Sequence, residues 1–159
     1  MKLSPSLIEK GKNILIALMT IFIINSFFLY LFGHLSGSDR YKLIATETAP
    51  WQALFGACIM APLIEELIFR YGTFQVLRTS SKFEQLKLPV MIISSVIFGW
   101  LHGSFFNVYI QGTAGFIMAW VYLKNNHSYW SSVIVHACWN FALLYWLPSM
   151  VQQPSLFSF

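Results

Sequence analysis

Charged side chains stand in the middle of an otherwise apolar stretch of this chain, where charge is costly. Glu65, Glu66 and Arg70 interrupt a run from about Trp51 to Leu77. Each such charge costs roughly 2.5–3.5 kcal/mol at a bilayer centre, so the three must face other protein segments and be paired. Glu66 and Arg70 are four residues apart on one helix face, which predicts an ion pair. Glu65 is rotated by about 100° from Glu66 and is left without a local partner.

Polar side chains interrupt two further apolar stretches. Phe98 and His102 lie one helical turn apart, and so do His136 and Asn140. A carboxylate, two imidazoles and a carboxamide in a dry cavity are the groups of a hydrolase, with Glu65 as general base on a water that His102 holds. The N–H groups of His136 and Asn140 suit an oxyanion hole. The competing interpretation is that these polar residues form a buried cluster whose only role is to pack the helices together.

The charge of this group predicts a further neutralising partner. Two carboxylates and one guanidinium, on Glu65, Glu66 and Arg70, leave one net negative charge in a low-dielectric site. One solution is a proton shared between Glu65 and His102. Another is a divalent metal such as zinc on Glu65, His102 and His136, because two histidines and one carboxylate form a catalytic zinc ligand set. The residues leave both solutions open.

The composition shows which elements must position these residues. Of 159 residues, 57% are apolar and only 10% are charged, with a mean hydropathy of +0.61, whereas soluble domains carry about 25% charged residues. The apolar excess excludes a disordered chain. Ten scattered basic residues and a net charge of +4 exclude a nucleic-acid partner. Cys58 and Cys138 lie singly in apolar runs, which predicts no disulfide framework. The lipid bilayer is the expected environment.

Apolar stretches of bilayer length predict an all-α, polytopic transmembrane bundle of about five spans. Leu88 to Leu123 is too long for one helix, and the break is expected between Gly103 and Gly112. Gly112, Gly115 and Ala119 have a spacing that suits close helix packing. The chain divides into a cytoplasmic N-terminus (1–12), an anchor helix (13–33), a core (50–147) and an uncharged tail (148–159).

Lysine and arginine positions predict the orientation. With the N-terminus in the cytoplasm and the C-terminus outside, the outer loops hold only Arg40 and Lys42. The inner side then holds seven basic residues: Lys2, Lys10, Lys12, Arg78, Lys82, Lys87 and Lys124.

Three motifs follow one another along the chain. Glu65 to Arg70 reads EExxxR, Phe98 to His102 reads FxxxH, and His136 to Asn140 reads HxxxN. Together they resemble the signatures of the CPBP family, also called Abi, which comprises CAAX prenyl endopeptidases and bacteriocin-processing or bacteriocin-immunity membrane proteins. The resemblance covers about Pro50 to Leu147.

The resemblance implies an intramembrane endopeptidase of a bacterial cytoplasmic membrane. It implies that Glu65 is the catalytic glutamate and that His102 is the histidine that activates the water. It implies further that His136 and Asn140 are the oxyanion donors. The implied supporting residues are Glu66, Arg70 and Phe98. The family has been described both as metalloproteases and as metal-free glutamate proteases. The chain contains no HExxH motif, and its motif residues are spread over three spans. Both features favour a glutamate mechanism with no required cofactor.

The expected substrate is a membrane-associated peptide or protein. Well-known CAAX endopeptidases have more than five spans, so a leader peptide or a pheromone is preferred here to a prenylated CAAX protein. The alternative is a non-catalytic bacteriocin-immunity or partner-binding protein of the same family. A proton relay in a small transporter is a third hypothesis, disfavoured because the chain has no internal repeat. The oligomeric state is left open.

Overall fold

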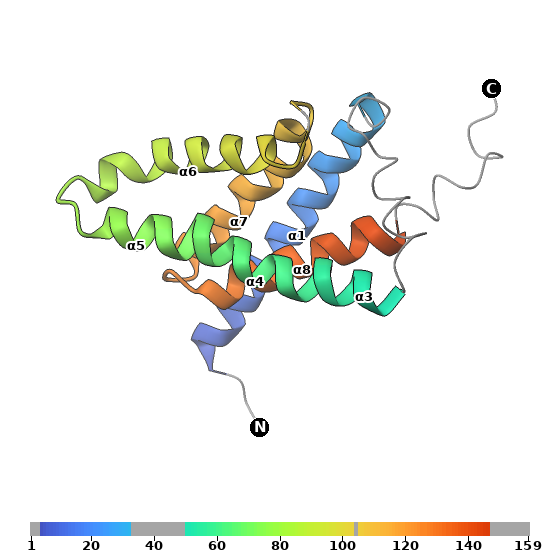
Figure 1. Cartoon of the computed structure of the whole chain (residues 1–159). Helices are drawn as coiled ribbons and strands as arrows, with labels where there is room; N and C mark the ends of the chain where they lie inside the picture. The colour runs from blue at the N-terminus through green and yellow to red at the C-terminus, as the bar shows by residue number, and fades with distance from the viewer. Residues whose placement is uncertain (1–3, 33–49, 104, 147–159) are drawn as a thin grey trace.

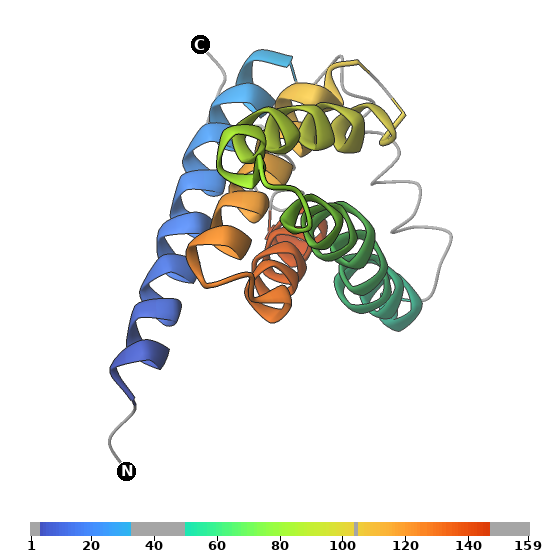
Figure 2. The ribbon, with the colours of Figure 1, turned by 90° about the vertical axis from the view of Figure 1, so that its left-hand side faces the viewer.

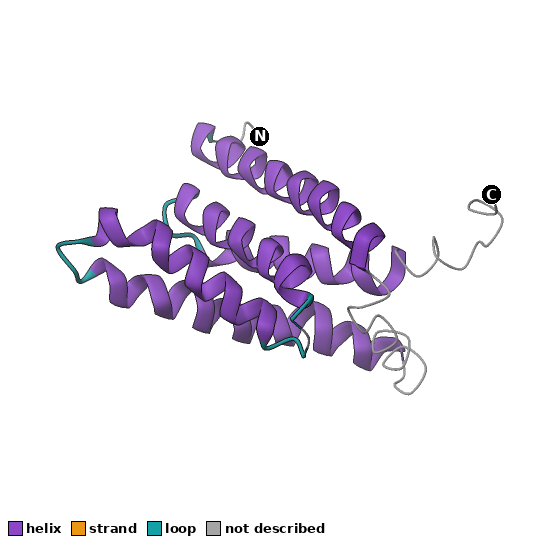
Figure 3. Cartoon of the chain, turned by 90° about the horizontal axis from the view of Figure 1, so that it is seen from above, coloured by secondary structure: helices purple, strands orange, loops and turns teal. Residues whose placement is uncertain are grey.

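The structure, a computed structural model, describes residues 4–32, 50–103 and 105–146. These residues form helices joined by short turns, with no strand among them (Figure 3). The predicted all-α fold is therefore confirmed for this part of the chain. The outer loop with Arg40 and Lys42 and the tail 148–159 lie outside the described residues.

The described residues form five helical rods. The first is α1 (Pro5–Phe32). The second runs unbroken through α3 (Pro50–Phe55), π-helical η1 (Gly56–Met60), α4 (Ala61–Glu66), π-helical η2 (Leu67–Gly72) and α5 (Thr73–Arg78). The others are α6 (Phe83–Trp100), η3 with α7 (Val108–Gly112, Thr113–Lys124), and α8 with η4 (Tyr129–Phe141, Ala142–Trp146).

The α3–α5 run, α6, α7 and α8 pack against one another, and α1 packs on α7 and α8. The α3–α5 run and α6 lie antiparallel, joined by a tight turn (Figure 1). Seen along these two rods, α1 stands at one edge of the molecule next to α7 (Figure 2). Helix α7 contacts α6, α1 and α8. It is therefore the central element against which the site-bearing helices pack.

Two helices begin earlier than the apolar stretches predicted. Helix α1 begins at Pro5 rather than Asn13, and Ser4 precedes it with its Oγ accepting the Leu7 N–H at 3.3 Å. Serine before a helix and proline at its first position are favourable starts. Helix α6 begins at Phe83 rather than Leu88 and continues through Pro89. At α1 the start follows the serine cap rather than the apolar run, whereas α6 begins at Phe83 without a side-chain cap.

Two described helices are long and apolar enough to cross a membrane. They are Pro5–Phe28, with a mean hydropathy of 1.6, and Phe83–Trp100, with a mean hydropathy of 1.2. Both expose large apolar side chains, among them Ile23 on α1 and Ile93 on α6. A soluble protein rarely exposes such continuous apolar faces. These features indicate a membrane protein, while the five-span topology and its orientation stay predictions.

Buried amides hold α1 onto the bundle. Asn13 donates its Nδ2–H to Asn125 Oδ1 at 2.8 Å, and Asn125 donates in turn to Ser131 Oγ at 3.0 Å. Farther along α1, Asn25 Oδ1 accepts the Thr113 hydroxyl at 2.8 Å. Helix α1, predicted as an anchor, is thus also part of the core that includes Met118 and Val135.

Candidate active site

The two neighbouring glutamates occupy different environments. Glu66 is fully buried, whereas the Glu65 side chain is 28% exposed. They end α4, directly before the π-helical segment η2. π-helical turns occur frequently at functional sites, because they re-aim side chains relative to a regular helix.

The predicted ion pair within this helix is confirmed. Arg70 Nε lies 3.2 Å from Glu66 Oε2, and both side chains are buried. Arg70 Nη2 also donates to the carbonyl oxygen of Gly115 on α7 at 2.8 Å. The guanidinium lies over the Phe98 ring, 4.6 Å from its centroid. Arg70 therefore connects α4, α6 and α7 through one buried charge.

Gly115 makes this connection possible. A Cβ atom at Gly115 would lie 2.9 Å from both Arg70 Nη2 and Phe98 Cδ1. The small-residue spacing predicted close packing here, and the structure confirms it. The sequence did not reveal that the Gly115 carbonyl is itself a partner of Arg70.

His136 joins α8 to both glutamates. Its Nδ1 lies 2.8 Å from Glu66 Oε1, and its Nε2 lies 3.6 Å from Glu65 Oε2. Because a carboxylate can only accept, Nδ1 carries the hydrogen of this bond. The imidazole is buried and packs edge-on against Phe98, with ring centroids 5.7 Å apart.

His102 is the second histidine that lies close to Glu65. Its Nε2 lies 3.9 Å from Glu65 Oε2, and its Nδ1 lies 2.7 Å from the Phe98 carbonyl oxygen. Glu65 Oε2 is buried and has no hydrogen-bond partner. Two imidazole nitrogens, one on α8 and one in the turn after α6, thus face one unpartnered carboxylate oxygen. Glu65, His102 and His136 therefore lie together, three of the four side chains that were predicted to converge with Asn140.

His102 is not inside a helix, contrary to the prediction that it lies within the third span. Helix α6 ends at Trp100, and His102 lies in the turn that follows. Gly103 has a φ of 97°, a left-handed conformation that glycine adopts without strain. Asn107 Nδ2 donates to the His102 carbonyl oxygen at 2.7 Å. The sequence predicted the helix break between Gly103 and Gly112. In the structure the break begins two residues before Gly103, at Leu101, and it includes His102.

Asn140, the fourth predicted site residue, bonds to a backbone oxygen. Its Nδ2 donates to the Ala57 carbonyl oxygen in η1 at 2.7 Å. This acceptor was not evident from the sequence. It fixes the carboxamide to the same continuous helix that carries Glu65.

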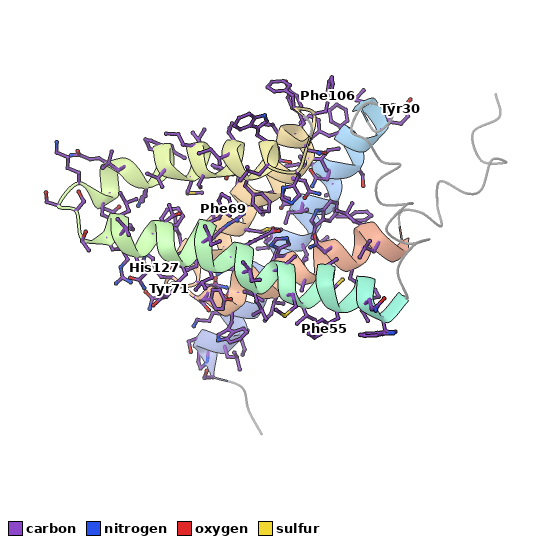
Figure 4. The ribbon with its side chains drawn as sticks, in the orientation of Figure 1. Tyr30, Phe55, Phe69, Tyr71, Phe106 and His127 are labelled. Carbon is purple, nitrogen blue, oxygen red and sulfur yellow. The ribbon has the colours of Figure 1, made fainter. Side chains whose placement is uncertain are left out.

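Aromatic side chains fill the space around the charges. Phe69 and Phe98 meet edge-on, with ring centroids 5.2 Å apart. Phe69 points from its helix toward α6, whereas Phe55 and Tyr71 lie on the other side of that helix (Figure 4). Phe98 also contacts His102, with centroids 4.7 Å apart. Phe98 therefore contacts both histidines and Arg70, and these contacts agree with its predicted supporting role.

A metal-bound alternative requires Glu65, His102 and His136 as ligands. Across the residues that the structure describes, no group of three or more His, Cys, Asp or Glu side chains is placed to hold a metal ion. Glu65, His102 and His136 are the residues that would hold one. His136 Nδ1 bonds to Glu66, as the second nitrogen of a metal-ligating histidine commonly bonds to a carboxylate. No chemical step is assigned to a metal below.

Sequence comparisons place this constellation in a known family. Residues 47–142 match the family described as "Type II CAAX prenyl endopeptidase Rce1-like". The chain is also 28% identical over 147 residues to a Bacillus subtilis (strain 168) protein named "Putative membrane peptidase YdiL". That alignment covers 84% of this chain and 58% of the relative, so the chain spans little more than half of the relative's length.

No solved structure is significantly similar to this chain. The family match covers most of the described helices and all three motifs, from Glu65 to Asn140. The chain belongs to the Rce1-like family of type II CAAX prenyl endopeptidases.

Proposed function

We propose that this chain is an intramembrane endopeptidase that hydrolyses a peptide bond of a membrane-associated peptide or protein. The observation that carries the proposal is the buried, unpartnered Glu65 Oε2, with His136 Nε2 at 3.6 Å and His102 Nε2 at 3.9 Å. Glu66 Oε2 also has no hydrogen-bond partner, but it is ion-paired with Arg70 Nε at 3.2 Å, and Glu66 Oε1 bonds to His136. The neighbours of Glu65 Oε2 are instead the two imidazole nitrogens. An acceptor held without a donor is suited to receiving a proton from a reacting water.

Glu65 and His102 would share the attacking water. The Nδ1 hydrogen of His102 is directed at the Phe98 carbonyl, so Nε2 of the neutral ring is an acceptor. Two acceptors 3.9 Å apart can both accept from one water molecule that donates a hydrogen to each. Glu65 would take the proton as the water oxygen attacks the carbonyl carbon, and would return it to the leaving amine.

His136 would stabilise the tetrahedral intermediate. A second proton, on Nε2, makes its ring a cation between two carboxylates. The charges of Glu65, Glu66, Arg70 and His136 then sum to zero, which answers the charge imbalance without a metal. The Nε2–H would be available to an oxyanion, and so would the Asn140 amide hydrogen that does not bond Ala57.

Access to this site would be from the side of Glu65 and His102. Their side chains are 28% and 27% exposed, whereas those of Glu66, Arg70 and His136 are buried. Substrate would meet the reacting carboxylate while the supporting charges stay enclosed. We place the chain in the bacterial cytoplasmic membrane with five spans, the N-terminus inside.

The test is cleavage of a library of membrane-associated peptides by detergent-purified wild type, Glu65→Gln and Glu84→Gln. Glu84 is an exposed glutamate that pairs with Lys87 at the start of α6, and it is the matched control. Wild type and Glu84→Gln should cleave the same peptides, and Glu65→Gln should not, at equal amounts of folded protein. Cleavage by all three at the same rate would refute the role of Glu65. Absence of cleavage in wild type, together with binding of a bacteriocin or its receptor, would support the non-catalytic alternative.

A further inference from the structure

We propose that Pro62 is a positioning residue for Asn140, because it frees the backbone carbonyl on which the Asn140 carboxamide is fixed. The contact itself is independent of what the protein does. Its effect on turnover rests on the proposed function, in which Asn140 donates to the oxyanion.

The Ala57 carbonyl has no backbone donor at either of its usual positions. In an α-helix it would accept from the N–H of Ala61, but that N–H bonds to the Gly56 oxygen instead. In the π-helical register it would accept from residue 62, which is proline and has no N–H. Asn140 supplies the donor, with its Nδ2 at 2.7 Å from the Ala57 oxygen.

Proline also accounts for the local change of helix type. A proline ring within a helix clashes with the carbonyl four residues earlier, here that of Cys58. Cys58 lies inside the π-helical segment Gly56–Met60, which ends just before Pro62. Pro62 is fully buried, so its ring is held in place by packing. One residue therefore widens the helix and removes the competing N–H.

Pro62→Ala should act on stability and turnover in opposite directions. Alanine restores an N–H that can bond the carbonyl of Cys58 or Ala57, and alanine is the better helix former. The Asn140 amide then loses its acceptor and its fixed orientation. A misplacement of about 1 Å costs on the order of 10²-fold in rate, so kcat should fall by that factor with KM unchanged and Tm unchanged or higher.

The experiment measures the asparagine side chain directly. The 159-residue chain labelled with 15N-asparagine is purified in detergent, and the Asn140 side-chain amide signal is assigned by its loss in Asn140→Asp. Pro89→Ala is the matched control, because Pro89 is also inside an apolar helix but on α6. The Asn140 signal should shift and exchange faster with solvent in Pro62→Ala, and should stay unchanged in Pro89→Ala.

Each outcome decides a separate question. An unchanged Asn140 signal in Pro62→Ala overturns the proposal, whatever happens to activity. If the wild-type protein is inactive and the Asn140 signal still shifts in Pro62→Ala, the link between Pro62 and Asn140 is upheld and the proposed function is refuted. A lower Tm in Pro62→Ala, with kcat reduced only in proportion to the folded fraction, also overturns the proposal. In an active protein, the effects of Pro62→Ala and Asn140→Ala on kcat should not add, because both act through one amide.

Discussion

Glu66 Oε1 and His136 Nδ1 lie 2.8 Å apart, although the two residues are 70 positions apart in the sequence. This bond joins α4 to α8 in the buried centre of the site, and Arg70 completes it from the other carboxylate oxygen. In the proposed mechanism the two adjacent glutamates have different roles. Glu66 holds α4 to α8, and Glu65 accepts the proton of the attacking water.

Glu66→Gln should destabilise the protein strongly. It leaves the buried Arg70 charge without its carboxylate, and breaking a buried pair from one side costs roughly 3–5 kcal/mol. The free energy of unfolding in denaturant titrations of detergent-solubilised protein measures this loss. Glu65→Gln, at the more exposed neighbour, should change the free energy by less than about 1 kcal/mol. Equal destabilisation by both variants would contradict the division of roles.

Gly115→Ala should also destabilise, for a steric reason. The added methyl would lie 2.9 Å from Arg70 Nη2 and from the Phe98 ring. Overpacking of this kind costs typically about 1–3 kcal/mol. Gly11→Ala is the control, because nothing lies within 4 Å of a Cβ at Gly11. The unfolding free energies of both variants are compared with wild type, and an unaffected Gly115→Ala protein would show that α7 is not fitted to Arg70 as described.

His102→Gln should reduce turnover far more than stability. The side chain is 27% exposed and lies in a turn, so its removal leaves the helices intact. Loss of a group that positions and shares a proton costs about 10²–10⁴-fold in kcat. The control is His127→Asn, because His127 has a φ of 58° and asparagine tolerates this left-handed conformation. Similar losses of kcat in both variants would argue against a specific role for His102.

Chelation should leave activity intact. The described residues offer no group of three His, Cys, Asp or Glu side chains placed for a metal, and the charge balance can be met by a proton on His136. Peptide cleavage is measured before and after dialysis against a strong chelator. A loss of activity that zinc restores would overturn the glutamate mechanism and favour ligation by Glu65, His102 and His136.

The sequence predicted the polar core because charge in an apolar stretch is informative. The spacing of Glu66 and Arg70 on one helix turn correctly predicted their ion pair. The apolar stretches also indicated where helices lie, although α1 begins at Pro5, after a serine cap, and α6 at Phe83, before its apolar run starts. These predictions depend on local patterns, which one sequence contains.

The remaining features depend on contacts between distant segments. Asn140 bonds to the Ala57 carbonyl, and Arg70 to the Gly115 carbonyl, and no side-chain pattern reports a backbone acceptor. His102 was expected inside a helix, because the apolar run continues past Trp100. The π-helical turn at Gly56–Met60 packs against α8, which is distant in the sequence.

The central claim is that Glu65 activates a water that attacks the peptide bond. A single-turnover reaction in water enriched in oxygen-18, with enzyme in excess over a peptide that it cleaves, tests this claim directly. The account predicts one 18O atom in the new carboxyl group of the product in the first turnover by wild type, and no product from Glu65→Gln. Product from Glu65→Gln at the wild-type rate, or 18O that enters Glu65 before it enters the product, would contradict it.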